Sequence, residues 1–559
     1  MKTSVRILIA ILVVTSMILP RVADLAKFTA ADEPFWLVVG ANYYYALTHG
    51  EFENTVYEYH PAVTTMWIGT AAMLVYFPEY RGLMKGYFQQ EKTSFDSYLV
   101  EHGKNPLVLL WWARFFQMLV NVFLFIVAFF LLRYLLDEWT ALAAILLTSF
   151  APYLFGQSRM LNHESMVGLF SLITVLAMTA HLFHKPKPAL LFLSASAVAY
   201  ANLTKSSSIV LFPVMAVMIF VALAVQWRTD KKTAAALGNF LKTYGLWFGI
   251  FVLVYFVSWP GMWADPAKML HEVYGNAFSY AFEGARLSVT QEVTAPSFSL
   301  SATISSFAKF VVSIGWHTTP LTWLGLILAI LFLFSKNQEQ FPLLAKYIIF
   351  FLLLEALACV GMFSVVSGRD QPHYVLAAYY GIEFSAGLGW IYALRWLARS
   401  FPWADKPLSQ TILFAVLLIA QAYPLFYTAP YYFTYLNPVM SLTGSRPATF
   451  FYGEGMEQAA AYLAEKPDAK NDAALVYFGR SFSYYYPGQT LLFKPILFDD
   501  QVQLKESLRQ VKYIVIYIPI DKRLPFLENV TPEHVIDLNG GPYINIYRVS
   551  DIPSSFFSE

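Results

Sequence analysis

The chain has 559 residues, of which 57% are apolar or aromatic and only 13% are charged, whereas an average soluble protein carries about 25% charged residues. Mean hydropathy is +0.49, and so few charges could not cover a soluble globule of this size. This composition excludes a soluble enzyme, a disordered protein and a fibrous protein, and it indicates a polytopic membrane protein. The 38 basic residues balance 37 acidic ones, which argues against a nucleic-acid-binding surface. Cys359 is the only cysteine, so an intramolecular disulfide and a cysteine-based metal site are excluded.

Eleven apolar segments approach or exceed the length of about 20 residues that a membrane-spanning helix needs. They lie at residues 5–22, 106–135, 138–156, 163–183, 189–203, 207–226, 239–258, 319–335, 343–366, 374–397 and 409–428. The first has a basic start but no clear small-residue cleavage site, so we expect a retained helix and not a signal peptide. A further apolar segment, 61–77, is short and predicts an interfacial or re-entrant helix.

Basic residues gather in alternate connections between these spans. Lys185 and Lys187, for example, lie in a predicted cytoplasmic connection, whereas the short connections on the opposite side hold only Lys205 and Arg369. Because short cytoplasmic connections are enriched in Lys and Arg, we expect a multi-pass plasma-membrane protein with a cytoplasmic N-terminus. With eleven spans, the carboxyl-terminal part is then extracytoplasmic.

The predicted fold is a polytopic α-helical membrane protein with a C-terminal soluble α/β domain. The transmembrane domain covers residues 1–436 and has outer loops at 23–105 and 259–318. From residue 437 to residue 559 apolar runs shorten and polar residues increase, and this length suffices for a core of its own. We expect helices at Met456–Glu465 and Leu504–Arg509, and strands at Ala473–Phe478, Lys512–Ile518 and Tyr543–Val549.

Two adjacent carboxylates, Asp32 and Glu33, directly follow the first span. Pro34 is typical of the first position of a helix, which would place Asp32 near the N-cap. One interpretation is a simple helix cap. The other is a general base at the membrane surface, where a partly desolvated carboxylate accepts a proton from an acceptor hydroxyl.

Aromatic residues and histidines follow in the same outer loop. Tyr43 and Tyr44 suit an aromatic belt at the headgroup level, and equally the flat face of a sugar. His60 precedes the apolar segment 61–77. These residues alone do not distinguish a sugar-binding surface from an aromatic belt at the membrane interface.

Charged residues cluster before the fourth span. Arg159, His163 and Glu164 lie at its predicted outer end. They could form a salt-bridged helix terminus. Alternatively they could bind phosphate and sugar, because an arginine can donate two parallel hydrogen bonds to a phosphate.

Two further cations lie at predicted outer ends of spans. Lys205 separates two apolar segments, where it is costly unless it reaches the surface or meets an anion. Arg369 could bind an anion or pair with the adjacent Asp370, and His373 follows three residues later.

Glu355 and Glu383 lie near the middle of predicted spans. Carboxylates at such depth are functional candidates by default, and a proton path would suit a transporter. The other interpretation is that they are protonated or hydrogen-bonded between helices.

In their order along the chain, these segments resemble the glycosyltransferase C superfamily, and within it the protein O-mannosyltransferase and aminoarabinose-transferase-like branch. The resemblance covers about residues 20–400. It rests on Asp32-Glu33, His60-Pro61-Ala62-Val63, Arg114 early in its span, Arg159, Lys205 in a Leu-Thr-Lys element, and the segment Arg369–Tyr374. Ala62 stands where the family has a second proline, and His163-Glu164 stands where many relatives carry an aspartate. The segment Tyr452–Gln458 is similar to Gly-Glu-Gly-rich linkers of some bacterial members, for which no activity is known.

The resemblance implies transfer of a sugar from a polyprenyl- or dolichyl-phosphate donor to a hydroxyl of a protein, lipid or glycan acceptor on the outer face. It implies inverting displacement without a nucleotide sugar. The sequence has no convincing metal-binding cluster, so we expect no metal requirement and no other cofactor, although Asp32 and Glu33 could bind a metal weakly. Asp32 would be the base, and Glu33 would share that role or position the acceptor. Cationic groups would offset the charge of the departing phosphate; the candidates are Arg159, Lys205, Arg369, His60 and His373. The expected substrate-binding residues are Tyr43, Tyr44, His163 and Glu164.

Two other function classes stay open. A transporter or flippase of lipid-linked sugars would use Glu355 and Glu383, although no inverted repeat is visible and the external mass is uneven. A non-catalytic scaffold would bind a partner through its carboxyl-terminal tail, and would tolerate replacement of Asp32, Glu33 and Arg159.

Overall fold

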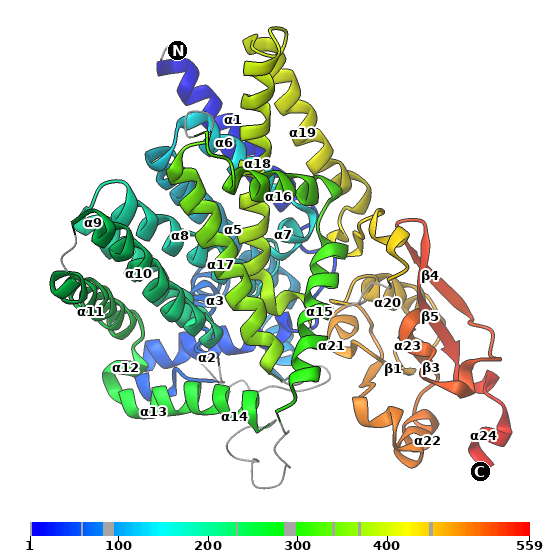
Figure 1. Ribbon diagram of the computed structural model, residues 1–559. Helices are drawn as coiled ribbons and strands as arrows, with labels where there is room; N and C mark the ends of the chain where they lie inside the picture. Colours follow the sequence, from blue (N-terminus) through cyan, green and yellow to red (C-terminus); the bar gives the residue numbers. More distant parts are fainter. Residues whose placement is uncertain are drawn as a thin grey trace.

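The computed structural model describes residues 3–57, 60–81, 94–230, 233–283, 298–337, 341–366, 371–445 and 451–558. Figure 1 shows a large helical bundle and, at the lower right, a smaller part built around a β-sheet. The N-terminus lies at the upper end of the bundle, and the sheet lies beside its lower end.

The bundle contains most of the helices. In chain order they are α1 (Thr3–Val22), α2 (Glu33–His49), α3 (Val63–Tyr76), α4 (Ser94–Glu101), α5 (Pro106–Leu135), α6 (Glu138–Ser149), α7 (Pro152–Gln157), α8 (Glu164–Phe183), α9 (Pro188–Thr204), α10 (Leu211–Asp230), α11 (Thr233–Ser258), α12 (Gly261–Ala264), α13 (Pro266–Leu270), α14 (Asn276–Phe282), α15 (Leu300–His317), α16 (Pro320–Leu333), α17 (Leu343–Val365), α18 (Leu376–Ser400) and α19 (Pro407–Thr428).

All eleven apolar segments predicted from the sequence fall on helices, and segment 138–156 is divided between α6 and α7. Within the described residues, six helical stretches are long and apolar enough to cross a membrane: Pro106–Leu135, Glu164–Phe183, Ser206–Trp227, Leu237–Ser258, Leu343–Val365 and Pro407–Thr428. A seventh crossing is possible if α15 and α16, which meet at 118°, form one broken span. The chain is therefore a multi-pass membrane protein, and the count of eleven stays a prediction.

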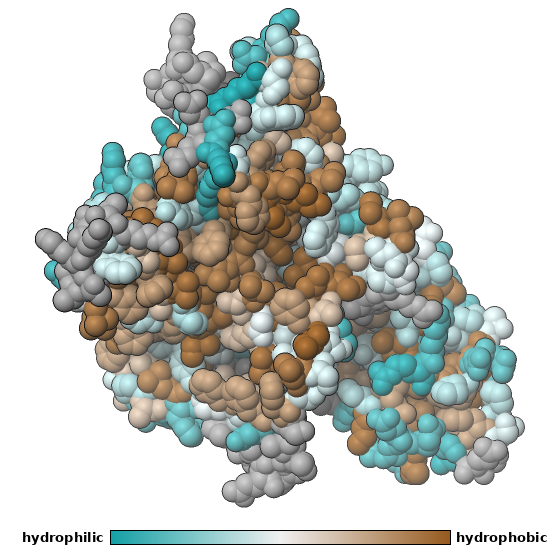
Figure 2. Space-filling view, viewed as in Figure 1, coloured by the Kyte–Doolittle hydropathy of each residue, from teal (hydrophilic) through white to brown (hydrophobic). Residues whose placement is uncertain are grey.

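Large apolar side chains cover the outside of the bundle. Phe123, Phe220, Leu253, Leu331 and Ile419 are each 59–66% exposed, and Figure 2 shows hydrophobic residues gathered over the bundle while polar residues dominate the sheet-containing part. An apolar surface of this extent fits contact with lipid and not with water.

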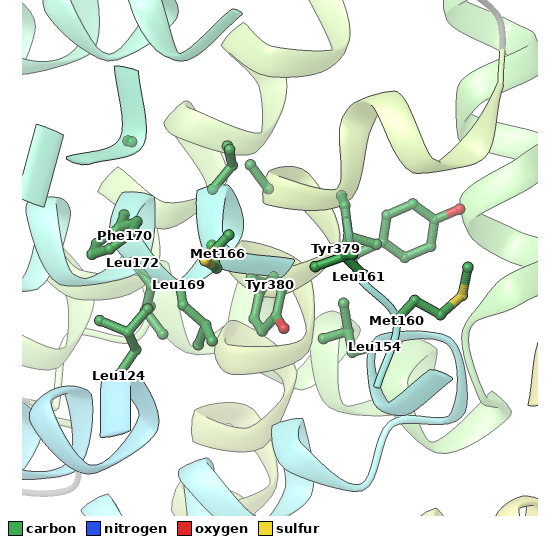
Figure 3. Close-up of a cluster of buried hydrophobic side chains, with 14 of the residues drawn as sticks. Leu124, Leu154, Met160, Leu161, Met166, Leu169, Phe170, Leu172, Tyr379 and Tyr380 are labelled. Atoms are coloured by element: carbon green, nitrogen blue, oxygen red, sulfur yellow. The ribbon is translucent and has the colours of Figure 1, made fainter. Parts of the chain in front are cut away.

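Helix α8 lies at the centre of the bundle. Its residues from Glu164 to Ala180 are buried, as expected for a helix that is apolar on all sides. Figure 3 shows Met166, Leu169 and Phe170 of α8 in one buried cluster with Leu124 of α5 and Tyr380 of α18. This packing fixes the start of α8, which carries two of the predicted site residues.

Helices α2 and α3 cross closely in the first outer loop. A Cβ atom added to Gly40 would lie 2.9 Å from Cα of Gly69, so only glycine permits this approach. The apolar segment 61–77 is thus a helix, as predicted, and its interfacial or re-entrant position stays a prediction. The crossing holds α2, and with it Asp32, against the bundle.

The two carboxylates inside predicted spans have different surroundings. Glu383 of α18 accepts hydrogen bonds from Thr322 at 2.9 Å and Gln421 at 3.2 Å, which corresponds to the interhelical hydrogen-bonded interpretation. Glu355 of α17 is 2% exposed, and its Oε1 has no hydrogen-bond partner within the described part of the chain.

The carboxyl-terminal part contains a five-stranded sheet of order β2-β1-β3-β5-β4. Its strands are β1 (Ala473–Val476), β2 (Gln489–Leu492), β3 (Tyr513–Tyr517), β4 (His534–Leu538) and β5 (Gly541–Arg548), with helices α20 (Met456–Ala464), α21 (Gly479–Ser483), α22 (Gln501–Arg509), α23 (Ile518–Asp521) and α24 (Ser554–Ser558). Strands β1 and β3 are parallel, and β5 is antiparallel to both β3 and β4. The three strands and two helices expected from the sequence are present.

Strands β2 and β4 were not predicted. Both lie at the edges of the sheet, and neither is buried along its whole length. An edge strand lacks the continuous apolar run that marks a central strand such as β3, whose five residues are all buried.

Candidate active site

Asp32 lies at the amino-terminal end of α2, as the sequence predicts. It occupies the N-cap position, with Pro34 in the first turn. Its side chain makes no capping hydrogen bond, and it is exposed on the wall of a cavity. The carboxylate therefore lacks the bond that defines a capping role and faces a space that a ligand can enter.

Glu33, the next residue, is enclosed in a buried ion pair. It is 1% exposed, and both of its oxygens contact the guanidinium of Arg114, with Nε at 2.7 Å. The main-chain amides of Leu161 and Ala30 donate to it at 2.8 and 2.7 Å. Arg114 also donates to the carbonyl oxygen of Phe28 at 2.8 Å. Glu33 thus joins α5, the segment before α8 and the turn that carries Asp32.

The cavity beside Asp32, here called the polar cavity, has a volume of about 500 Å³. Its lining includes Asp32, Trp36, His163, Glu164, His373 and Tyr452. These residues come from α2, from the start of α8, from the segment before α18 and from the loop before α20. Helix ends and loops that are distant in sequence therefore converge on this cavity.

His163 lines the polar cavity and contacts both α3 and α2. Its Nδ1 lies 2.8 Å from the hydroxyl of Thr65 in α3, and its ring packs edge-on against Trp36 at 4.0 Å between centroids. Its Nε2 has no hydrogen-bond partner among the described residues. Nearby, Ala62 has a φ of 54°, which proline cannot adopt, so the missing second proline accompanies a different backbone at the start of α3.

Lys205 ends α9 and is 1% exposed. Its Nζ donates to Oε1 of Glu164 at 2.5 Å and lies 4.9 Å from the ring centroid of Tyr374. A buried ammonium group is tolerated only with such partners. The ion pair also connects α9 to the start of α8.

A second cavity, here called the apolar cavity, adjoins the first and has a volume of about 330 Å³. Apolar side chains form most of its lining, among them Ile209, Phe278, Met362, Phe363 and Val366. Lys205 lies on its wall as well.

The two cavities share three lining residues, His60, Tyr280 and Tyr374. Of the buried ion pair, Glu164 lines the polar cavity and Lys205 lines the apolar one. The pair therefore lies where the two spaces meet. A polar compartment joined to an apolar one at a cation suits a ligand with a polar head and an apolar tail.

The carboxyl-terminal part also contributes to the polar cavity. Phe451, Tyr452, Tyr477 and Phe478 are on its wall, and sequence reasoning missed all four as site residues. The segment Tyr452–Gln458 carries a Gly-Glu-Gly motif, but no pattern in the sequence places it beside Asp32.

Asp32 has an unusual electrostatic environment. Solvent reaches it through the cavity, yet protein surrounds it, and this burial raises the pKa of its carboxyl above the ordinary value. Two positive charges, that of Arg480 and more weakly that of Lys205, lower the pKa of Asp32 and so oppose the effect of burial. The negative charge of Glu33 raises this pKa further. A raised pKa is the adjustment that a general base needs in order to accept a proton near neutral pH.

Several predicted site residues lie elsewhere. Tyr43 is 0% exposed and packs edge-on against Trp67 at 5.5 Å between centroids. The hydroxyl of Tyr44 donates to the carbonyl oxygen of Pro78 at 2.8 Å. Neither tyrosine lines either cavity, so both pack inside the first outer loop.

The other predicted cations differ in position. Arg159 contacts the carbonyl oxygen of Ala23, and its guanidinium lies 4.8 Å from the ring centroid of Tyr432; it lines neither cavity. His60 and His373 do line the polar cavity. Arg369 lies outside the described residues. Within the described residues, no three His, Cys, Asp or Glu side chains are close enough together to hold a metal ion.

Comparison with protein families relates this site to known proteins. Residues 108–259 match the family model described as dolichyl-phosphate-mannose-protein mannosyltransferase. Over this segment the chain is similar to a protein mannosyltransferase family, in agreement with the resemblance that its sequence shows. The match covers about a quarter of the chain and includes Arg114, His163, Glu164 and Lys205. A comparison with curated proteins finds no match.

Several solved structures are similar to this chain. ArnT from Cupriavidus metallidurans bound to undecaprenyl phosphate is 11% identical, with a TM-score of 0.42 and 98% of each chain covered. The apo oligosaccharyltransferase of Archaeoglobus fulgidus is 11% identical, with a TM-score of 0.44 and coverage of 92% of this chain and 69% of that one. The same organism's AglB, in complex with an inhibitory peptide and a dolichol-phosphate, is 10% identical, with a TM-score of 0.43 and coverage of 98% and 76%.

Proposed function

We propose that this chain is a membrane glycosyltransferase that moves a sugar from a polyprenyl-phosphate-sugar donor to an acceptor hydroxyl at the outer membrane surface. The observation that carries the proposal is the polar cavity with Asp32, joined to an apolar cavity at the Lys205–Glu164 pair. The family match over residues 108–259 supports it, since a dolichyl-phosphate sugar is the donor that the family's description names.

In the proposed reaction, Asp32 accepts the proton of the acceptor hydroxyl. The acceptor oxygen attacks the anomeric carbon of the donor sugar, the bond from that carbon to the phosphate oxygen breaks, and polyprenyl phosphate leaves. The anomeric centre is inverted, because one displacement takes place. The lipid chain would occupy the apolar cavity, and Lys205 would offset the negative charge that grows on the departing phosphate.

Glu33 has a separate role in this proposal. Its side chain holds Arg114 and two main-chain amides, those of Leu161 and Ala30, in place, so it positions the turn of Asp32 and does not act as the base. His163, with its Nε2 directed to no protein partner among the described residues, is proposed to contact the sugar or the acceptor.

The test is sugar transfer by the purified chain in liposomes that contain radiolabelled polyprenyl-phosphate sugars. Each donor is offered with peptides, lipids and oligosaccharides as acceptors. Transfer of label, with release of polyprenyl phosphate, is expected for at least one combination. Movement of intact donor across the bilayer without bond cleavage would instead establish the flippase alternative.

We also propose the predicted eleven spans, a cytoplasmic N-terminus and an extracytoplasmic domain over residues 437–559. The N-terminus and the sheet lie at opposite ends of the bundle in Figure 1, which supports this orientation. With buried Cys359 replaced by serine, a cysteine introduced at exposed Asn539 should react with an impermeant maleimide added outside intact cells. Reaction only after lysis would contradict the orientation.

Lys205→Gln is expected to raise the donor KM by about tenfold or more, because a charge-assisted hydrogen bond to phosphate is lost. This variant also leaves Glu164 buried without its cation. The double variant Lys205→Gln with Glu164→Gln removes both charges, and its KM should stay raised. Recovery of a normal KM in the double variant would mean that the pair is structural. Lys268→Gln, an exposed lysine of the second outer loop, is the matched control.

Arg480→Gln is expected to move the acidic limb of the pH–rate profile to higher pH. The reason is that the charge of Arg480 lowers the pKa of Asp32. Asp32 must be deprotonated to act as a base, so activity is lost as pH falls through its pKa, and a higher pKa moves that loss to higher pH. Exposed Arg509→Gln, in the same domain, should leave the limb in place. An unchanged limb in Arg480→Gln would show that another group governs it.

A further inference from the structure

The loop from Phe451 to Gly455 lies between the sheet and the first outer loop. On the sheet side, the ring of Phe451 stacks on Tyr517 of β3, with 4.0 Å between centroids and 5° between planes. The hydroxyl of Tyr517 also donates to the carbonyl oxygen of Glu454 at 3.0 Å. The sheet therefore holds this loop at two points.

On the other side, the loop contacts the turn that carries Asp32. The amide of Ala31 donates to the carbonyl oxygen of Tyr452 at 2.9 Å, directly before Asp32 in the chain. Gly453 has a φ of +111°, and a Cβ added to it would lie 2.4 Å from the carbonyl oxygen of Thr29. Only glycine permits this approach at that φ, so the loop is closely fitted to this turn.

Tyr452 lines the polar cavity and packs against several other segments. Its hydroxyl lies 3.3 Å from Nδ1 of His373 and 2.7 Å from the hydroxyl of Tyr153, and its ring packs against Phe433 at 4.3 Å between centroids. Tyr452 is thus in contact with three separate segments of the bundle, as well as with Ala31.

The side chain of Glu454 fixes the main chain at Tyr452. It is 0% exposed, and its Oε2 accepts the main-chain amide of Tyr452 at 2.7 Å. A buried carboxylate is costly and is retained where its hydrogen bonds fix a geometry. Here Glu454 fixes the main chain of Tyr452, whose carbonyl oxygen contacts the turn that carries Asp32.

We infer that Tyr452 is a positioning residue for Asp32 and His373, held in place by Glu454, and that the carboxyl-terminal domain completes the active cavity through this loop. The inference rests on the proposed function. It assigns a role to the Gly-Glu-Gly segment, namely to set the distance of the general base from the bound substrates. Misplacement of a reacting group by about 1 Å can reduce a rate by about 100-fold.

The experiment measures kcat and donor KM for Glu454→Ala, Glu454→Gln and Tyr452→Phe, each normalised to folded protein. Glu454→Ala removes the acceptor for the Tyr452 amide and should lower kcat between about tenfold and about 100-fold with KM within twofold. Glu454→Gln keeps a carbonyl acceptor and should recover most of kcat. Tyr452→Phe keeps the bond to Ala31 but loses the contact with His373, and should lower kcat less than Glu454→Ala.

Tyr462→Phe is the matched control, because it removes a tyrosine hydroxyl that bonds Glu533 in the same domain, outside both cavities. Its kcat should equal that of the wild type. Hydrogen exchange at the amide of Ala31 should become faster in Glu454→Ala and stay unchanged in Tyr462→Phe. A kcat for Glu454→Ala within twofold of the wild type overturns the inference alone. Absence of transfer by the wild type overturns the proposed function and the inference with it.

Discussion

Replacement of Asp32 by asparagine is expected to lower the rate of sugar transfer by about 1,000-fold, within the range of 10² to 10⁴ for a lost general base. Asparagine keeps the size and polarity of the side chain but cannot accept the proton of the acceptor hydroxyl. Because Asp32 makes no capping hydrogen bond, the folded state loses no such bond. It loses the interaction of the carboxylate charge with the helix dipole, about 0.3–1 kcal/mol, and its attraction to Arg480 and Lys205. The measurement is single-turnover transfer with saturating donor.

The comparison that isolates this effect uses Glu53→Gln, which removes an exposed carboxylate from the same outer loop. We expect Glu53→Gln to transfer sugar at the wild-type rate and Asp32→Asn to bind donor with wild-type affinity. If Asp32→Asn transfers sugar at an undiminished rate, the base is another residue, and the proposed reaction loses its central group.

The membrane part of the fold was predictable because its signal is local. Each span needs only a continuous apolar run, and α5 and α17 coincide with the predicted segments to within a residue. Burial of β3 on both faces likewise shows in its apolar sequence. In contrast, β2 and β4 form through pairing with β1 and β5, and that pairing leaves little mark in the edge strands themselves.

The site was predictable in composition but not in arrangement. Asp32 and Glu33 have the same chemistry and adjacent positions, and both line the polar cavity. Asp32 is nevertheless exposed there, whereas Glu33 is buried in an ion pair with Arg114, which lies 81 positions along the chain. A carboxylate's surroundings decide its role, and those surroundings come from distant segments. For the same reason the wall formed by Tyr452 and Phe478 could not be predicted, since the sheet brings it to Asp32.

Tyr43 and Tyr44 illustrate a different ambiguity. A helix such as α2 turns successive residues about 100° apart, so adjacent tyrosines cannot all face one ligand. Trp36, one residue of the same helix that was not singled out, lines the polar cavity instead. The aromatic residues in the sequence of α2 therefore do not show which ring lines the cavity. The packing of the helix decides this.

Glu33→Gln is expected to destabilise the chain by about 3–5 kcal/mol, because it leaves the buried guanidinium of Arg114 without its counter-charge. Arg114 is 3% exposed, so water cannot replace the lost carboxylate. The measurement is the free energy of unfolding in mixed detergent micelles, followed by tryptophan fluorescence. Glu138→Gln, which removes an exposed ion pair with Arg133, should change that free energy by less than about 1 kcal/mol.

Paired replacement separates a charge effect from a packing effect at this site. Arg114→Met alone leaves the carboxylate of Glu33 uncompensated and should be as destabilising as Glu33→Gln. The double variant Glu33→Gln with Arg114→Met removes both charges, and its loss should be smaller than the sum of the two single losses by about 0.5–3 kcal/mol. Additive losses would show that the two side chains act independently. Full stability of Glu33→Gln, combined with loss of transfer, would return Glu33 to the role of a catalytic carboxylate.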